Sequence, residues 1–274
     1  MTKLLQISDL HFGTEQADVM WALAALSNDK KPDVLVVSGD ITQRAKPDEF
    51  SRARAFCDSL GIAHMVALPG NHDIPLFNLF ARLLKPYAAY QSAFGQALEC
   101  ELITPALCLV TVNTTRWWRH KNGEVSVTQI ERVCEHLSRA APQQLRVVVV
   151  HQPVHVLRPQ DEHDRLRGWQ SAVRAWAAAG ADVVIGGHIH LPYVCELSST
   201  VNALARRMWC VQAGTAVSSR IQREAPNSVN LLVFSSADGG PRDGPRCSVE
   251  RWDYQAVGGR FALAHTSELN LQRD

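Results

Sequence analysis

Short apolar, β-branched runs alternate with stretches of helical spacing along the first two thirds of the chain. Five of these runs are followed within a few residues by histidine, aspartate or asparagine. They cover Leu4–Ser8, Val34–Ser38, Met65–Leu68, Val147–Val150 and Val183–Ile185. Apolar runs of this length predict strands that are buried on both faces. The first two thirds of the chain therefore indicate an α/β fold.

Four segments between these strands have the composition or apolar spacing of helices. They are Asp18–Ser27, Pro47–Leu60, Thr128–Ala140 and Gly168–Ala179. The segment 128–140 places its apolar residues on one side. Thr128 is the expected N-cap of this helix, with Glu131 as its capping-box partner, and Gly180 is expected to end the helix at 168–179.

The pattern changes at about residue 192, where short β-like segments follow one another without a long helix. They are Tyr193–Leu197, Met208–Gln212, Val229–Phe234 and Ser248–Tyr254. We expect them to form antiparallel strands of a second sheet packed on the first. Residues 239–241 predict a turn-rich loop. The weak pattern after residue 257 predicts a C-terminal tail, 258–274, that is partly disordered or an interaction arm, so residues 1–257 are expected to form a single domain.

Composition narrows the class of protein. The chain has 274 residues, of which 46% are hydrophobic and 20% are charged, as in ordinary globular proteins. Its formal net charge of +1 indicates neither nucleic acid nor an acidic membrane as a partner, although a local patch can hide in a neutral total. The seven cysteines form no Cys-x-x-Cys pair, which favours free thiols and argues against a cysteine-ligated zinc.

Neither a signal peptide nor a membrane span is expected. The first strand begins too close to Met1 to leave room for a signal peptide. No apolar stretch approaches the ~20 residues needed to cross a bilayer. We therefore expect a cytoplasmic protein with no integral membrane segment.

The polar residues after the five strands are those that bind metals. Ligands in open α/β sheets bind beyond the carboxyl ends of the strands, so these side chains should meet there. The candidate ligands are Asp9, His11, Asp40, Asn71, His151, His188 and His190. Imidazole and carboxylate together suit transition metals better than calcium. Seven ligands are too many for one ion that also binds water and substrate, whereas two ions sharing a carboxylate satisfy the count.

Five motifs, taken in order, resemble those of the calcineurin-like metallophosphoesterases. They are Asp9-x-His11, Gly39-Asp40, Gly70-Asn71-His72-Asp73, His151 and Gly187-His188-x-His190. The resemblance covers roughly residues 3–215 and implies a four-layer α/β/β/α sandwich of two mixed sheets flanked by helices. Residues 214–223 with Asn227 and Ser228 are similar to a segment of the bacterial cyclic-nucleotide phosphodiesterase-like group.

The same resemblance implies a role for each residue. One metal would be held by Asp9, His11, Asp40 and His190, and the other by Asp40, Asn71, His151 and His188. Asp40 would bridge two ions of manganese, iron or zinc, and a hydroxide between them would attack phosphorus in line. His72 would contact the phosphoryl oxygens or protonate the leaving oxygen. Asp73 would orient His72 or another group without binding a metal itself. Taken singly, each residue has a structural alternative: Asp9 and Asp40 as helix caps, Asn71 and Asp73 as turn residues, and His151 as a core histidine.

Candidates for substrate binding are weaker. Asn113 and Arg116 follow the apolar run 107–112, and Arg220 lies in the segment 214–223. Arg116 reaches a phosphate or is a solvated loop arginine. The aromatic and leucine-rich segment 74–94 forms an apolar wall for a base or an acyl chain, or packs on the core or on another subunit, which leaves a homodimer open. The arginine-rich loop 155–167 covers an anionic substrate or is simply solvated.

The function expected from these features is hydrolysis of a phosphodiester by a binuclear metal centre. A phosphomonoesterase or protein phosphatase of the same fold is the alternative, and a non-catalytic scaffold is a further one. The near-neutral charge favours a small-molecule or lipid-linked phosphoester over nucleic acid, which a cationic track would bind. Gln152 follows His151 where many phosphodiesterase relatives carry a second histidine, and this weakens the inference to cyclic nucleotides.

Overall fold

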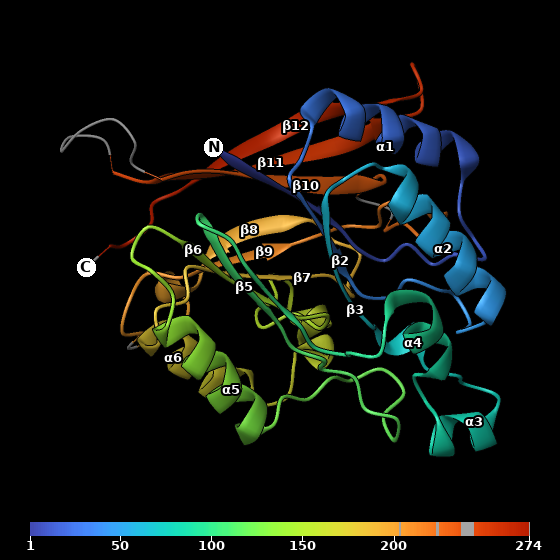
Figure 1. The fold of residues 1–274 in the computed structure, drawn as a ribbon, viewed down its shortest axis with the longest axis horizontal. Helices are drawn as coiled ribbons and strands as arrows, with labels where there is room; N and C mark the ends of the chain where they lie inside the picture. Colours follow the sequence, from blue (N-terminus) through green and yellow to red (C-terminus); the bar gives the residue numbers. More distant parts are fainter. Residues whose placement is uncertain (203, 223–224, 237–243, 274) are drawn as a thin grey trace.

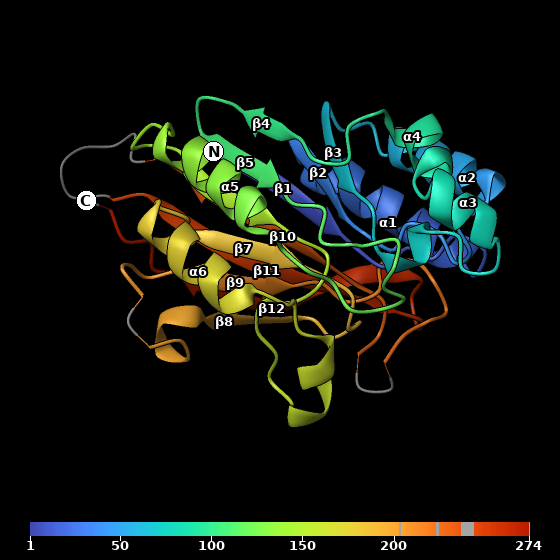
Figure 2. The ribbon, with the colours of Figure 1, turned by 90° about the horizontal axis from the view of Figure 1, so that it is seen from below.

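Two six-stranded mixed sheets lie face to face between layers of helices (Figures 1 and 2). The computed structural model describes residues 1–202, 204–222, 225–236 and 244–273. Apolar side chains fill the space between the sheets and the space between each sheet and its helices, giving three clusters of buried residues. This confirms the predicted α/β fold with two mixed sheets flanked by helices.

The first sheet has the strand order β12-β11-β10-β1-β2-β3. Its parallel strands are β1 (Thr2–Ile7), β2 (Val34–Ser38) and β3 (His64–Leu68). Its antiparallel strands are β10 (Ser228–Ser235), β11 (Arg246–Gln255) and β12 (Arg260–Leu269). The parallel strands are mainly apolar, and β2 and most of β1 are buried, as expected for strands covered on both faces.

The second sheet has the order β4-β5-β6-β7-β9-β8. Its parallel strands are β5 (Leu107–Thr111), β6 (Leu145–Val149), β7 (Val183–Gly186) and β9 (Trp209–Gln212). Two antiparallel strands, β4 (Glu101–Ile103) and β8 (Tyr193–Glu196), form its edges. The carboxyl ends of the parallel strands of each sheet share one edge, and this places the site.

Helices cover the outer face of each sheet. The first sheet packs against α1 (Ala17–Lys30), α2 (Pro47–Ser59) and α4 (Ala88–Phe94). The second packs against α5 (Val127–Ser138) and α6 (Trp169–Ala178). Helix α3 (Leu79–Leu84) has no buried residue. Short 3-10 turns lie at Asn71–Asp73, Pro159–Asp164 and Leu197–Ser199.

Three details differ from the sequence-based expectations. β10 and β11 join the first sheet through β1, rather than the second sheet, because the pairing of strands distant in sequence leaves no local pattern. Residues 260–269 of the expected tail form β12, paired along its length with β11. Ser126 caps α5, with Gln129 completing the capping box, two residues before the cap expected at Thr128. The loop expected at 239–241 lies outside the described residues.

Two further expectations concern cysteines and membrane spans. The seven cysteines are free thiols. Among the described residues, no helix has the length and apolar character needed to span a bilayer.

Candidate metal centre

Loops after five parallel strands bring the predicted ligands together. The first sheet contributes Asp9 and His11 after β1, Asp40 after β2 and Asn71 after β3, whereas the second contributes His151 after β6, and His188 and His190 after β7. The two sets meet, since His190 Nε2 lies 3.4 Å from Asp9 Oδ1 and 3.3 Å from His11 Nε2. The cluster therefore straddles both sheets.

Most of these residues have an unusual backbone conformation. Five of the seven have positive φ angles, namely Asp9 (53°), His11 (43°), Asp40 (48°), His188 (76°) and His190 (57°). This left-handed region is uncommon for residues other than glycine. Each such residue costs on the order of 1–3 kcal/mol, and such strain concentrates at functional sites. The left-handed backbone conformation turns side chains of the same loop, such as those of Asp9 and His11, toward one point.

Asp40 lies between two groups of ligand atoms. Asp9, His11 and His190 form one group, and Asp40, His151 and His188 form the other, with the ligand atoms of each group within 4.8 Å of one another. One oxygen of Asp40 lies 3.8 Å from His11 Nε2, and the other lies 3.2 Å from His151 Nε2. Asn71 Oδ1 joins the second group at 3.3 Å from His151 Nε2. Asp40 therefore stands where a bridging ligand would stand.

The other ring nitrogens of two of these histidines are held by the protein. His151 Nδ1 lies 2.8 Å from the carbonyl oxygen of Ser38, to which it donates. His190 Nδ1 lies 2.6 Å from both Thr215 Oγ1 and the carbonyl oxygen of Arg220. These contacts leave Nε2 of each ring facing the cluster. Backing of this kind is usual for histidines that bind metals.

Burial and mutual charge set the protonation of the cluster. Burial lowers the pKa of His11 and of His188, so both rings are neutral, as metal ligands must be. Burial alone would raise the pKa of Asp40, but the charges of His151 and His72 hold it well below its usual value. Although burial opposes it, the charge of Asp40 raises the pKa of His151 to about 9. A cation bound here would replace that proton.

The side chains present fit two transition-metal ions. Asp9 Oδ1 and His188 Nδ1 are buried and make no hydrogen bond within the described residues. Buried polar atoms are rarely left unsatisfied unless an unseen ion or water completes them. Asp9, His11, Asp40 and His190 would hold one ion, and Asp40, Asn71, His151 and His188 the other. Carboxylate, imidazole and amide donors suit manganese, iron and zinc alike.

Gly70 leaves the room that this arrangement needs. A Cβ atom at position 70 would collide with the backbone nitrogen and Oδ1 of Asp40 and would lie 2.8 Å from His151 Nε2. The loop after β3 can pass this close to the other two loops only without a side chain at this position. The glycine thus sets the distance between Asp40 and Asn71.

We expect Gly70→Ala to lower the stability of the metal-free protein by about 1–3 kcal/mol, the usual cost of overpacking, and to reduce metal content. Thermal unfolding and metal analysis of the purified variant measure both. Gly244→Ala is the matched control, because a Cβ atom there meets nothing within 4 Å. Unchanged metal content in Gly70→Ala would contradict this account of the loop.

His72 lies beside the ligands together with Arg220. Its Nδ1 is 3.1 Å from the carbonyl oxygen of Gln43, and its ring meets that of His11 edge to face at 4.8 Å. Arg220 Nη1 lies 3.2 Å from His72 Nε2 and donates to Gln43 Oε1 at 2.9 Å. The side chain of Arg220 thus reaches the cluster, as the sequence predicts. Arg223 lies outside the described residues.

Asp73 acts on backbone rather than on His72. Its carboxylate accepts hydrogen bonds from the backbone nitrogens of Ile41, Thr42 and Gly70 and from the hydroxyl of Thr42. Burial and the charge of Asp40 raise the pKa of Asp73 to about 6. Asp73 therefore ties the loop after β2 to the loop after β3, and so sets where Asp40 and Asn71 stand.

The side chains of Asn113 and Arg116 form hydrogen bonds within the loop after β5 and to α5. The guanidinium of Arg116 donates to the carbonyl oxygens of Asn113 and Thr115 and to Gln129 Oε1 at the start of α5. Asn113 Oδ1 accepts from the backbone nitrogen and hydroxyl of Thr115. These hydrogen bonds hold the loop after β5 in shape.

Asp164 is a neighbour of the ligands that the sequence did not reveal. Its Oδ1 lies 3.5 Å from His188 Nε2 and 2.7 Å from Lys121 Nζ. Burial would raise the pKa of Asp164, but the hydrogen bonds and charges of His188 and Lys121 lower it to about 2. Nothing in its spacing separates Asp164 from the other charged residues of the loop 155–167. That loop is thus anchored to the second ligand group.

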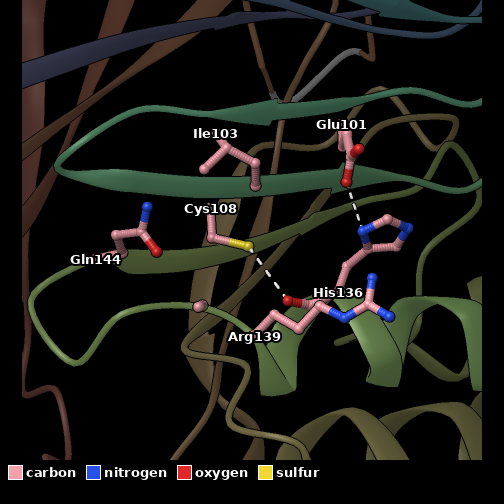
Figure 3. A pocket seen from close by; sticks show the side chains of 7 residues that line it. Glu101, Ile103, Cys108, His136, Arg139 and Gln144 are labelled. Carbon is pink, nitrogen blue, oxygen red and sulfur yellow. Dashed lines mark hydrogen bonds and ion pairs between the residues drawn. The ribbon is translucent and has the colours of Figure 1, made fainter.

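A separate hollow lies between β4, β5 and α5, with a volume of about 250 Å³ (Figure 3). Its lining residues include Glu101, Cys108, His136 and Arg139. His136 Nδ1 lies 2.5 Å from Glu101 Oε2, so the imidazole is paired. None of the predicted ligands lines this hollow. It is therefore distinct from the metal cluster.

Sequence relatives include phosphodiesterases. The chain is 23% identical over 202 residues to a cAMP/cGMP dual specificity phosphodiesterase of Mycobacterium tuberculosis, covering 68% of this chain and 61% of that protein. It is 26% identical over 164 residues to the glycerophosphodiester phosphodiesterase GpdQ of Enterobacter lignolyticus, covering 55% of this chain and 57% of that protein. The chain therefore spans less than two thirds of the length of either relative.

A solved structure and the family comparison agree with the architecture. The fold resembles that of a dimetal phosphatase from Danio rerio, with a TM-score of 0.65 at 13% identity over 99% of both chains. Residues 2–192 match the calcineurin-like phosphoesterases. Because that match covers most of the chain and contains every strand end that carries a candidate ligand, the protein belongs to the calcineurin-like phosphoesterase family.

Proposed function

We propose that the protein is a metal-dependent phosphodiesterase that uses two ions of manganese, iron or zinc. The observation that supports this most is the pair of ligand groups on either side of Asp40, with one of its oxygens facing His11 and the other His151. A single shared carboxylate between two sets of imidazoles suits two adjacent ions. Members of the family bind two metal ions, in keeping with this assignment.

The reaction we propose is in-line displacement at phosphorus by hydroxide, with no covalent intermediate on the protein. When bound, the ions would lower the pKa of water and neutralise charge on the phosphoryl oxygens. Asp40 orients both halves of the cluster, and its Oδ1 also accepts from the backbone nitrogen of His72 at 2.8 Å. This bond fixes His72 relative to the metal ligands, so that its ring lies where the substrate must pass.

His72 and Arg220 are the groups we assign to the phosphoester itself. Arg220 donates toward His72 Nε2 and Gln43, so both the guanidinium and the imidazole face the same space. An anionic phosphoester entering that space attracts the guanidinium. His72 Nε2, released from Arg220, must then carry a proton in order to donate to a phosphoryl oxygen or to protonate the leaving oxygen. The carbonyl oxygen of Arg220 accepts a hydrogen bond from Nδ1 of His190, one of the candidate metal ligands. This contact therefore positions Arg220 relative to the ligands.

The charge near the cluster favours a diester over a monoester. A diester carries one negative charge, whereas a monoester carries up to two at neutral pH. Among the described residues, Arg220 is the guanidinium that contacts the cluster, while Arg116 is engaged at α5. The named activities of the two relatives, on cyclic nucleotides and on glycerophosphodiesters, also favour a diester. We propose a small-molecule or lipid-linked phosphodiester as the substrate.

The test is turnover by protein reconstituted with manganese, iron or zinc. We expect bis(p-nitrophenyl) phosphate to be hydrolysed with a higher kcat/KM than p-nitrophenyl phosphate, and chelation to abolish both activities. A higher value for the monoester would support the phosphomonoesterase or protein phosphatase alternative. Full metal loading without turnover of either substrate would support the scaffold alternative.

A further inference from the structure

Helix α3 and the two residues before it carry large apolar side chains that face solvent. Five of them are between 56% and 78% exposed: Phe77, Leu79, Phe80, Leu83 and Leu84. The helix projects from the edge of the molecule, apart from both sheets (Figure 1). The segment 77–84 therefore forms an apolar surface that the rest of the chain does not cover, and surfaces of this kind mark sites of interaction.

Two tryptophans extend this surface from a second segment. Trp117 and Trp118 lie after β5, and Trp118 is 56% exposed. Arg82 of α3 joins the two segments, because its Nη2 donates to the carbonyl oxygen of Arg119 at 2.6 Å and its Nη1 to that of Pro75 at 3.1 Å. We call residues 77–84 with Trp117 and Trp118 the α3 surface.

Positive charge surrounds the α3 surface. The sequence has no acidic residue between Asp73 and Glu99. Arg44, Arg82 and Lys85 border the surface, and none of them pairs with a carboxylate of the described residues. The guanidinium of Arg44 lies 5.3 Å from the centre of the Phe77 ring. The surface is thus apolar at its centre and cationic at its margin.

A groove adjoins this surface, with a volume of about 840 Å³. Its lining residues include Arg44, Lys46, Phe77 and Lys85. Its mixed lining of apolar and cationic side chains suits a molecule that has an acyl chain and an anionic headgroup.

We propose that the α3 surface docks onto an anionic lipid bilayer. Exposed phenylalanine, leucine and tryptophan enter the boundary between headgroups and acyl chains, and flanking arginine and lysine bind anionic headgroups. The cationic margin of the α3 surface favours an anionic bilayer over a partner without net charge. It also explains how a chain with a net charge of only +1 can bind a charged surface.

Docking would bring the metal cluster close to the headgroups. Arg44 follows Gln43, whose side chain accepts from Arg220, and Phe77 lies five residues after His72. The substrate would then be a phosphodiester of a lipid headgroup or one released beside the membrane, and this consequence rests on the proposed function. The docking itself does not, because it is measured without turnover.

The experiment is co-sedimentation of the full chain with vesicles of phosphatidylcholine alone and with added phosphatidylglycerol. We expect binding to the anionic vesicles to be at least about tenfold stronger at low salt and to weaken as salt rises. The double variant Phe77→Ser/Phe80→Ser and the variant Lys85→Glu should each weaken it, the first by about tenfold or more. Trp21→Ser is the control: this side chain is 72% exposed on α1, on the opposite side of the molecule from α3 (Figure 1).

Three outcomes would overturn the proposal. Wild-type protein could fail to bind anionic vesicles, or the double variant could bind as tightly as the wild type. The wild type could also form a dimer that Phe77→Ser/Phe80→Ser dissociates without any vesicle binding, which would assign the surface to a second copy of the chain. Circular dichroism and turnover of a soluble diester by the variants show that loss of vesicle binding is not loss of folding.

Discussion

The Asp40→Ala variant is expected to bind at most one metal ion per chain and to lose turnover by well over about 10²-fold. Removing groups that merely support metal ligands costs 10–100-fold in affinity or activity, and Asp40 faces both ligand groups directly. The variant also deprives His151 of the carboxylate that raises its pKa, and the backbone nitrogen of His72 of its acceptor. One substitution therefore acts on both metals and on the proton donor.

Metal analysis after exhaustive dialysis and kcat/KM for a phosphodiester measure this result. Asp29→Ala serves as the control, because Asp29 is an exposed aspartate whose ion-pair partner among the described residues is Lys30, at 3.0 Å. Far-UV circular dichroism establishes that Asp40→Ala remains folded. Two ions per chain with turnover within tenfold of the wild type would show that Asp40 is not a bridge.

The His72→Ala variant is expected to keep both ions and to lose about 10²–10⁴-fold in rate, the usual contribution of a positioned proton donor. The loss should depend on the leaving group. Diesters with an alkyl leaving group need a proton on the departing oxygen, whereas p-nitrophenolate leaves without one. We therefore expect a large effect on the alkyl diester and a much smaller effect on the nitrophenyl diester.

Comparing the two substrates also separates proton donation from metal binding. The ring of His72 lies close enough to His11 and Asp40 for these three to form a third group of candidate ligands. If His72 were a ligand, His72→Ala would lower metal content and reduce turnover of both diesters alike. His265→Ala, an exposed histidine on β12, should leave metal content and both rates unchanged.

The strands that position the ligands could be predicted from sequence because their apolar runs are local signals. β2 begins and ends where its run does, and the helix at 47–59 begins at the predicted Pro47. β12 carries no such signal, because five of its ten residues are polar or charged, and it is held by pairing with β11 and by the packing of Phe261 on Tyr254. Contacts of this kind depend on a distant partner.

The candidate site divides in the same way. Asp9 and His188 follow strands within two or three residues, so their meeting at one edge follows from topology. Arg116 also follows a parallel strand, β5, though less closely, and its guanidinium binds Gln129 of α5, the next helix in the chain. Asp164 does not directly follow a strand. It stands at the end of the 3-10 turn Pro159–Asp164, which brings its carboxylate to His188. The position of a residue after a strand indicates where its backbone lies, while the direction of its side chain depends on neighbours.

The cluster of candidate metal ligands lies between the two sheets and takes residues from both. Cations held there would cross-link the two sheets. Each ion would bind residues that follow β1, β2 or β3 of the first sheet and residues that follow β6 or β7 of the second. Because the ions would bind only when the two sheets are together, their binding free energy would add to the free energy needed to separate the sheets. The concentration of free metal would thus set the stability of the two-sheet structure as well as the rate of turnover.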